Sequence, residues 1–543
     1  MVLISCATLY ICVADPGFRT QIALNHTELK HKEQYKCASC LTIEPLLFRL
    51  LLPAKRPFQT LSRLKTTGII LLLTTGALVV HGYHPYAEDA EIYLPGIEKL
   101  LNPKLFPTGT EFFESHASLT LFPNLIAASV RVAHLPFGYA LFGWQLIAIF
   151  LLLLACWEVS GVCFETARAR WGATALVASL LTMPVAGTAL YLVDQYLNPR
   201  NLAAFAGVFA VCAVLKKKYW RMAAWLLFAA AVHPLMSSFA ICLCVILIVT
   251  EKIPRAATAM ALVFPFTNFF ARPTAEYREA MRFHVSHFLL NWHWYEWLGI
   301  FAPIAILIWF GRLARVHRLT NLERLCRALV IYEVLYFAVA LIVAIPERFE
   351  AIARLQPLRS LHLVYVFMLI AIGGFAAEYV LKRRVWRWLV LFAPLCAGMF
   401  YAQRQLFPAS AQVEWPWASS KNEWQQAFLW IRQNTPIDAQ FAINPFYMET
   451  PGEDTNGFRA LAQRSRLADA NKDSGAVAMF PPLATEWWEQ FQAQKDWNKL
   501  SAADFQNLRQ RYGIGWVVLQ APGLAGMNCP YRNSAAVICR LGE

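Results

Sequence analysis

Long apolar runs separated by short basic segments occupy the chain between residues 67 and 402. Several of these runs reach about 15 to 21 residues, close to the length with which a helix crosses the hydrocarbon core of a bilayer. The pattern predicts a mainly α protein whose central part is a polytopic bundle of about eleven transmembrane helices. The expected spans lie near residues 67–83, 138–157, 171–191, 199–215, 221–233, 236–250, 257–270, 298–311, 328–345, 360–381 and 388–402.

The segment before the first run, residues 1–66, is a polar and mixed leader. We expect it to stay in the cytoplasm, because basic residues are retained on that side of a membrane. Alternating crossings then place the first loop and the C-terminal region outside, and they place later basic segments such as "KKKYWR" and "KRRVWR" inside. The basic residues that end the leader are Arg49, Lys55, Arg56, Arg63 and Lys65.

The first outer loop, residues 84–137, contains two amphipathic segments that we expect to lie at the outer membrane interface. In 87–101 the apolar positions share one face at helical spacing, whereas Glu91 and Glu98 fall outside that face. The second segment, 119–138, is apolar but must not cross, because a crossing there would reverse the sidedness of every later basic segment.

The composition changes after residue 403. "WPWASSKNEWQQAFLWIRQNTPIDAQFAINPFYM" reads as an amphipathic helix followed by a strand, and "ADFQNLRQRYGIGWVVLQ" repeats that order. We predict a small extracytoplasmic α/β domain over 403–543, large enough to have its own core. Cys529 and Cys539 both lie in it, and outside the cytoplasm they could form a disulfide.

The composition agrees with a membrane protein. The 543 residues are 57% hydrophobic and 15% charged, and a soluble protein this apolar could not cover its surface. The net charge of +14 does not predict nucleic-acid binding, because Lys and Arg lie mostly between the apolar runs. No glycine-rich phosphate loop or Walker motif is present in the sequence, which argues against ATP-driven transport by this chain alone.

Two groups of acids are candidates for chemistry at the outer face. Glu88 and Asp89 follow the first span, and a carboxylate there could act as a general base or bind a divalent cation that grips a phosphate. They could instead be acids that favour the first turn of a helix, which alone would explain Glu88 and Asp89. Asp194, in "LYLVDQYLNPRNLAAF", follows the span 171–191, and its alternatives are an interfacial cap or an ion pair with Arg200.

Cationic groups at the same face are candidates for binding a substrate phosphate. His233 precedes a proline at the outer end of a short span, and its alternative role is that of a packed histidine bonded to a carbonyl. A loop rich in Arg, His and aromatic residues follows the span 257–270, and it could instead be an interfacial helix with an aromatic belt. The candidate substrate-binding residues are His233, Arg200, Arg272, Arg278, Arg282 and Arg348.

The order of these features resembles the GT-C class of integral-membrane glycosyltransferases, which use polyprenyl-phosphate sugars as donors. The likeness covers about 67–402: a cytoplasmic N-terminus, an acidic outer loop with interfacial helices, and a second acid in "YLVDQYLNPRNLAAFAGVFAVCAVLKKKY". The tail "WIRQNTPIDAQFAINP … FRALAQRSRLADANKD" resembles C-terminal regions of bacterial membrane proteins related to that class.

The resemblance implies a role for each acid. Asp89 matches the first-loop catalytic acid and would deprotonate an acceptor, with Glu88 beside it, while Asp194 matches the second-loop acid and would position the acceptor or a metal. The outer arginines would hold the lipid phosphate. The sequence does not identify a cofactor, and a divalent cation is the one candidate.

The expected function is transfer of a sugar, with inversion, from a polyprenyl-phosphate carrier to a glycan, lipid or protein acceptor outside the bacterial inner membrane. Membrane lipids are further expected partners, and nucleic acid is not. Two alternatives stay open: a non-catalytic lipid or sugar transporter, and an envelope scaffold whose outer domain recruits other enzymes. A transporter predicts acids deep within spans, for which Glu333 and Glu378 are the main candidates.

Overall fold

The computed structural model describes residues 57–252, 273–344 and 353–542. Its contacts divide the chain into two units, residues 1–72 and 73–543. The described part of the first unit is helical, since the helix α2 (Pro57–His81) begins in it and continues into the second unit. The predicted spans near 257–270, together with Arg272, Arg348 and most of the leader, lie outside the described residues.

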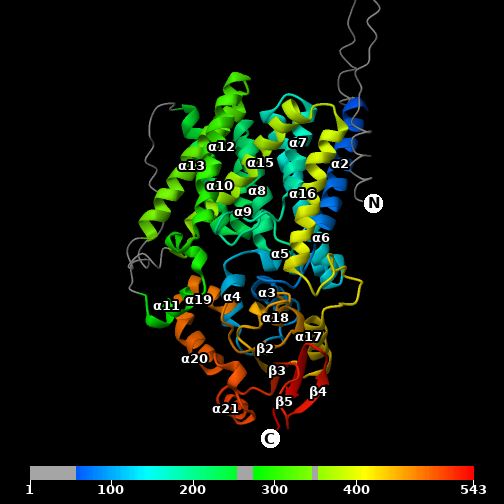
Figure 1. The fold of residues 1–543 in the computed structure, drawn as a ribbon, viewed down its shortest axis with the longest axis vertical. Coiled ribbons are helices and arrows are strands. Elements are labelled where there is room, and N and C mark those ends of the chain that lie inside the picture. Colours follow the sequence, from blue (N-terminus) through cyan, green and yellow to red (C-terminus); the bar gives the residue numbers. More distant parts are fainter. Residues whose placement is uncertain (1–56, 253–272, 345–352, 543) are drawn as a thin grey trace, which may run out of the picture. The chain divides into compact units, whose positions relative to one another are not determined.

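Six helical segments of the described residues are long and apolar enough to cross a membrane. The predictions of a mainly helical protein and of membrane-length helices are therefore confirmed. Six such segments do not confirm the predicted number of about eleven spans. The six segments are Leu64–His81 in α2, α6 (Phe137–Cys163), α12 (Trp294–Val316), α13 (Thr320–Ala344), the continuous run Pro357–Leu381 and α16 (Val385–Leu406) (Figure 1).

The other predicted spans form shorter helices. α8 (Pro199–Leu215), α9 (Tyr219–Val232) and α10 (Pro234–Lys252) occur near their expected positions. The predicted span 171–191 is different, because its helix α7 (Ala167–Ser179) has 13 residues and the chain then continues without a helix as far as Asn198. At about 1.5 Å per residue, α7 is too short to cross a bilayer core alone.

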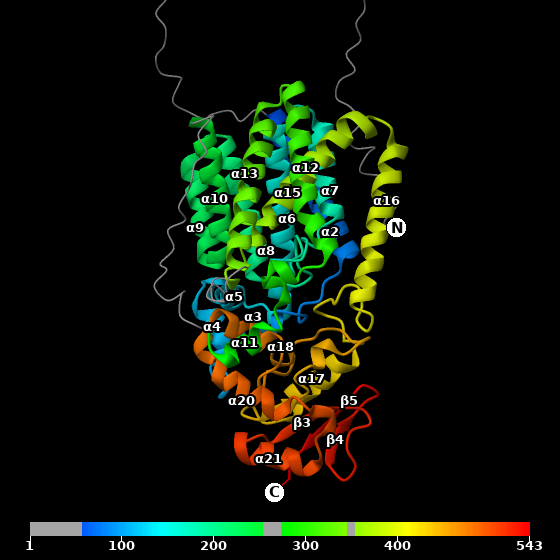
Figure 2. The ribbon, with the colours of Figure 1, turned by 60° about the vertical axis from the view of Figure 1, so that its left-hand side comes forward.

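The segment Pro357–Leu381 is the most buried of the six membrane-length segments. It consists of η4 (Pro357–Ser360), α15 (Leu361–Phe375) and η5 (Ala376–Leu381), and α15 packs against α7. A Cβ on Gly172 would lie 2.6 Å from the carbonyl oxygen of Gly373, so the absence of side chains lets these two helices approach closely. In contrast, α16 lies at the edge of the helices in Figure 2 and has few buried residues.

The C-terminal region contains a small mixed sheet, as predicted. Its strand order is β2-β1-β3-β5-β4, in which β1 is parallel to β2 and β3, and β5 is antiparallel to β3 and β4. The strands are β1 (Gln440–Ile443), β2 (Ser465–Arg466), β3 (Trp516–Gln520), β4 (Asn528–Arg532) and β5 (Ala536–Arg540).

Helices cover both faces of this sheet. Phe441, Ile443 and Val518 point to the face covered by α17 (Glu423–Asn434) and α18 (Phe458–Ala462). The alternate strand residues point to the opposite face, which is covered by η8 (Trp497–Lys499) and α21 (Ala502–Tyr512). The alternation follows from the two-residue period of a strand.

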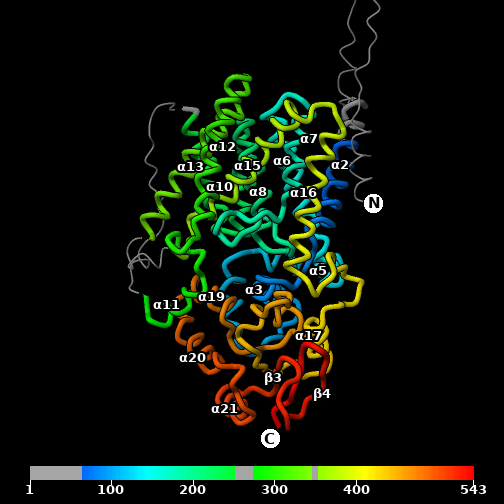
Figure 3. Tube along the Cα trace, in the orientation of Figure 1, coloured from blue at the N-terminus to red at the C-terminus, as the bar shows by residue number. Residues whose placement is uncertain are grey.

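The first outer loop forms three helices rather than the two that we expected. They are α3 (Ala90–Leu101), α4 (Glu111–Ser118) and α5 (Phe122–Ala133). Arg131 in the last turn of α5 and His134 just after it are exposed, in line with a polar edge at this end of the helix. α3, however, packs against α18 of the C-terminal region, and Figure 3 places it among segments of that region.

This docking buries the two acids of α3 that we expected outside its apolar face. Glu91 is 0% exposed and accepts hydrogen bonds from the backbone N–H of Arg459 (2.7 Å) and from Nε of Arg466 (2.9 Å). Arg459 in turn donates both Nη groups to Asp473 at 2.9 Å each. The acids are buried because arginines of the C-terminal region are buried with them, and the sequence of α3 alone carries no sign of those partners.

Glu98, at the other end of α3, is also buried, but it has fewer hydrogen-bond partners than Glu91. Its Oε1 accepts a hydrogen bond from Nε2 of Gln463 at 2.9 Å, and its Oε2 has no hydrogen-bond partner within the described part of the chain. Burial raises the pKa of Glu98 to about 8, against the opposing influence of the Gln463 hydrogen bond and of Arg432. The native state therefore favours the protonated acid at neutral pH.

We predict that Glu98→Gln removes a pH dependence from the stability of the protein. Because the folded-state pKa is raised, the contribution of Glu98 is fully present below pH 4.5 and is lost as the pH rises through about 8. The wild type should lose up to about 1.4 kcal/mol per pH unit in this window through Glu98, and the Gln variant should not. Thermal unfolding of both proteins at pH 5 and pH 8 measures the difference.

The control for this experiment is Glu114→Gln, at an exposed acid of α4 that pairs with Lys99. This control variant should change the unfolding temperature only slightly, and by the same amount at pH 5 and at pH 8. An advantage of Glu98→Gln over wild type that is the same at pH 5 and at pH 8 would contradict the assignment.

Candidate functional site

Four segments far apart in the sequence bring charged side chains together at the start of α3. Asp89 is the N-cap of α3, Asp194 lies in the non-helical segment after α7, Arg200 is in the first turn of α8, and Lys472 begins α19 (Lys472–Met479). Arg200 donates from Nη1 to Oδ2 of Asp89 at 2.8 Å and from Nη2 to Oδ2 of Asp194 at 3.1 Å. One guanidinium thus joins the two predicted acids.

Local sequence fixes the Asp194 side of this cluster. Asn198 caps α8 through Oδ1, which accepts from the N–H of Asn201 at 3.0 Å, while its Nδ2 donates to Oδ2 of Asp194 at 2.5 Å. Gln145 of α6 donates from Nε2 to the carbonyl oxygen of Asp194 at 2.8 Å. Asp194 has a side chain only 6% exposed, so it is a buried acid whose partner is the guanidinium of Arg200.

The Asp89 side of the cluster is more open and includes a residue of the C-terminal region. Nζ of Lys472 lies 3.0 Å from Oδ1 of Asp89 and 2.6 Å from Oε2 of Glu88. The side chains of Asp89 and Glu88 are 25% and 39% exposed, whereas that of Lys472 is 11% exposed. A ligand could therefore reach the carboxylates of the first loop, while the cations behind them are shielded.

The cations keep Asp89 ionised. Burial alone would raise the pKa of Asp89, but Lys472 and Arg200 outweigh it and hold the pKa well below its usual value. Burial would likewise lower the pKa of Lys472, yet Asp89 and Glu88 raise it overall. At neutral pH the cluster therefore holds a carboxylate that accepts from two cations, and such a carboxylate becomes a stronger base when a cation moves away.

Histidines and a further arginine lie beside this cluster. Arg359 of η4 is close enough to Arg200, Asp89, Tyr93 and Asp194 to interact with them electrostatically. Its buried Nε has no hydrogen-bond partner in the described ranges. Burial lowers the pKa of His116 to about 4 and that of His284 to about 4, so both are neutral near pH 7.

The remaining predicted substrate-binding residues are placed differently. His233 caps the end of α9 and interacts electrostatically with Arg200 and Arg359, which puts it near the cluster. Arg278 is exposed, and Arg282 has a side chain 74% exposed that pairs with Glu279. Neither arginine is among the ion-pair partners of Asp89 and Asp194 in the described structure.

Two members of the cluster were not predicted from the sequence. Lys472 lies in a polar stretch of the C-terminal region, and no local pattern separates it from the neighbouring charges. Arg359 belongs to the basic string "ARLQPLRS" at the start of a membrane-length segment, and its position in an apolar helix end was a usable signal. Tertiary packing brings Lys472 into contact with Asp89 and Arg359 close to it.

The acids of the cluster do not fit a metal site in the described residues. No group of three or more His, Cys, Asp or Glu side chains among those residues could hold a metal ion. Arg200 also occupies the space between Asp89 and Asp194, where a shared cation would have to lie. We therefore assign no step of the chemistry to a metal.

The two acids that a transporter would place within spans behave differently from each other. Glu378 lies in η5 and pairs with Arg168 at 2.9 Å. Glu333 lies within α13, is 1% exposed, and neither of its carboxylate oxygens has a hydrogen-bond partner among the described residues. Such a buried acid is uncommon in a membrane-length helix, and it is separate from the Asp89 cluster.

Comparisons with known proteins do not assign the chain to a family. No family model matches it, and no curated protein matches it. The function is therefore argued from the site.

We predict that Arg200 and Asp194 are strongly coupled. Arg200→Gln should lower the free energy of unfolding by about 3–5 kcal/mol, because it leaves a buried carboxylate without its cation. The double variant Arg200→Gln/Asp194→Asn should lose less than the sum of the two single variants. Thermal or denaturant unfolding of the four proteins in one detergent gives the coupling energy.

Lys216→Gln is a matched control, since Lys216 pairs with Glu158 at side chains that are 32% and 43% exposed. It should cost less than about 1 kcal/mol. Additive losses for Arg200 and Asp194, within the error of the control, would mean that the guanidinium does not compensate Asp194.

Proposed function

We propose that the protein is a membrane glycosyltransferase of the GT-C type that transfers a sugar from a polyprenyl-phosphate donor to an extracytoplasmic acceptor. The observation that carries the proposal is the shared guanidinium: Arg200 contacts Asp89 at 2.8 Å and Asp194 at 3.1 Å. Two acids from separate outer segments at one partly open site match the two-acid arrangement that the resemblance implies.

In the proposed reaction Asp89 is the general base. A hydroxyl of the acceptor approaches the exposed side of Asp89, gives its proton to the carboxylate, and forms the bond to the anomeric carbon of the donor sugar. The bond between that carbon and the lipid phosphate breaks, and the phosphate leaves with the electron pair. One displacement inverts the configuration at the sugar carbon.

The cations have two roles in this proposal. Lys472 and Arg200 hold Asp89 in place at rest and weaken it as a base, so binding of an anionic donor that attracts one of them would raise the basicity of Asp89. Arg359, whose Nε lacks a partner in the described structure, is the best placed cation to receive the donor phosphate. Arg272, Arg278, Arg282 and Arg348 remain candidates for the path by which the lipid headgroup arrives.

The proposed setting is the bacterial inner membrane, with the N-terminus in the cytoplasm and the C-terminal region outside. About eleven crossings would combine the six membrane-length segments with shorter helices that pair or tilt in the bundle. The acceptor is a glycan, a lipid or a protein. Because the C-terminal region contributes Lys472 to the site, its involvement in the reaction is favoured over a role in recruitment alone.

We predict that Asp89→Asn abolishes transfer without unfolding the protein. Purified protein in proteoliposomes is supplied with polyprenyl-phosphate hexoses labelled in the sugar and with a lipid and glycan extract of the host envelope. Transfer of label out of the donor should fall by about 10²–10⁴-fold, the usual contribution of a general base. The protein should stay folded but unfold at a lower temperature than the wild type, because Lys472 and Arg200 lose a charged partner.

Glu88→Gln makes the same chemical change one residue away, at a side chain 39% exposed, and should reduce transfer by far less. Transfer by Asp89→Asn at a rate close to wild type would show that Asp89 is not the base. Wild-type protein that moves labelled lipid across the bilayer and transfers no sugar would replace the proposal by a lipid transporter.

A further inference from the structure

The C-terminal region has a second site, a crevice at the carboxyl ends of two parallel strands. It is open to solvent and has a volume of about 220 Å³. One wall follows β1 and includes Asn444, and the other follows β3 and includes residues Gln520 and Leu524. None of the members of the Asp89 cluster lines it.

The topology of the sheet places a ligand site at this point. The chain leaves β1 for β2 on one side, and it later returns to β3 on the other side of β1. As a result α18 and α21 pack on opposite faces of the sheet. The carboxyl ends of β1 and β3 therefore flank the point where the strand order reverses, and open α/β sheets bind ligands in the crevice at that point.

Aromatic and amide side chains form much of the crevice, and none of the described residues that line it is charged. Trp424 and Tyr447 come from the α17 face of the sheet, and Trp497 and Phe505 come from the α21 face. Their rings are held by core packing, with Trp424, Tyr447 and Trp497 each at most 6% exposed. A lining without charge does not favour phosphate, nucleotide or carboxylate ligands.

The polar groups of the crevice are largely uncommitted. The Oδ1 of Asn444 accepts from the N–H of Phe446 at 2.9 Å, which leaves its Nδ2 free to face a ligand. In the described structure no hydrogen bond is made by the side chains of Thr450, Asn498 or Gln520. Each amide offers both donors and an acceptor, and the hydroxyl offers one of each, so together they match a ligand rich in hydroxyls.

We propose that this crevice binds a neutral carbohydrate. The hydroxyl groups of a pyranose both donate and accept hydrogen bonds, as the four polar side chains do, and its C–H groups suit the uncharged apolar side chains of the lining. The inference is independent of the Asp89 chemistry, because it concerns binding by another part of the chain.

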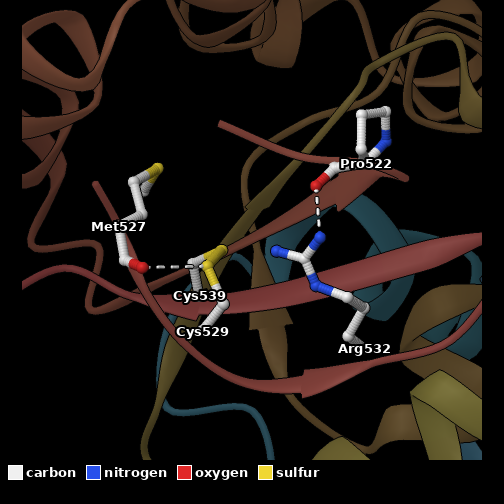
Figure 4. Close-up of a disulfide and its surroundings, with 5 residues drawn as sticks. All are labelled: Pro522, Met527, Cys529, Arg532 and Cys539. Atoms are coloured by element: carbon white, nitrogen blue, oxygen red, sulfur yellow. Dashed lines mark hydrogen bonds between the residues drawn. A yellow bond between two sulfur atoms is a disulfide. The ribbon is translucent and has the colours of Figure 1, made fainter. Parts of the chain in front are cut away.

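The wall after β3 is held in place by the neighbouring hairpin (Figure 4). Arg532 of β4 donates from Nη1 to the carbonyl oxygen of Pro522 at 2.9 Å. The sulfurs of Cys529 and Cys539, which we expected to pair, are joined and tie β4 to β5 at the end of the same loop. A fixed loop limits the ordering that a bound sugar would otherwise require.

Calorimetric titration of the full chain in lipid nanodiscs tests the proposal, since maltoside detergents carry competing sugar headgroups. The probes are three neutral trisaccharides, namely maltotriose, cellotriose and chitotriose, with inorganic phosphate as the anionic comparison. At least one trisaccharide should bind with a Kd at or below about 1 mM, and phosphate should not displace it. Asn498→Ala and Gln520→Ala should each weaken binding by about tenfold.

Asn507→Ala and Gln510→Ala are matched controls at exposed amides of α21 outside the crevice, and they should leave the Kd unchanged. The proposal is overturned if no trisaccharide binds at about 5 mM, or if binding persists in the Asn498→Ala/Gln520→Ala double variant. Sugar binding that disappears in Asp89→Asn and survives in the double variant would instead locate the sugar at the Asp89 cluster.

Discussion

The burial of Glu91 is the constraint on which the rest of the outer region depends. A carboxylate that is 0% exposed is stable only if cations and N–H groups replace its water. Arg459 and Arg466, which lie 368 and 375 residues away in the sequence, supply them. α3 therefore docks where these arginines are, and the first loop and the C-terminal region fold as one structure.

The candidate site follows directly from this docking. Asp89 is two residues before Glu91, and Lys472 is next to Asp473, the partner of Arg459. The buried network thus sets the positions of a carboxylate and a cation that meet at its edge. On the membrane side, Asn198 and Gln145 hold Asp194 so that Arg200 reaches both acids. The buried ion pairs of Glu91 and Asp473 thus position the charges that we propose to meet the substrate.

The helical part of the fold could be predicted because apolar length is a local property. The apolar runs, the helix and strand alternation after residue 403, and the closeness of Asp89 and Asp194, which Arg200 joins, all agree with what the pattern predicted. The predicted span 171–191 was wrong in its second half. Its residues are apolar but include Pro184 and Gly187, and a Cβ on Gly187 would lie 2.6 Å from the ring of Trp292. The segment is buried by packing against other segments rather than as a membrane helix.

The sequence pattern could not predict which side chains from distant parts of the chain pair with these acids. Glu91 and Glu98 read as polar positions of an interfacial helix, since nothing in α3 indicates that arginines and a glutamine from beyond residue 450 would bury them. Lys472 was missed for the same reason. The arginines of α11 (Ala275–Met281) and the residues that follow it were favoured as phosphate ligands on composition alone, and the structure leaves Arg278 and Arg282 exposed.

Hydrogen–deuterium exchange of Glu91→Gln against wild type tests most directly whether one network holds the first loop, the C-terminal region and the acid cluster together. The account predicts faster exchange in residues 84–101 and in 458–473 at the same time, because both segments depend on the same buried ion pairs. Faster exchange confined to the turn around Glu91, with 458–473 as protected as in the wild type, would contradict it.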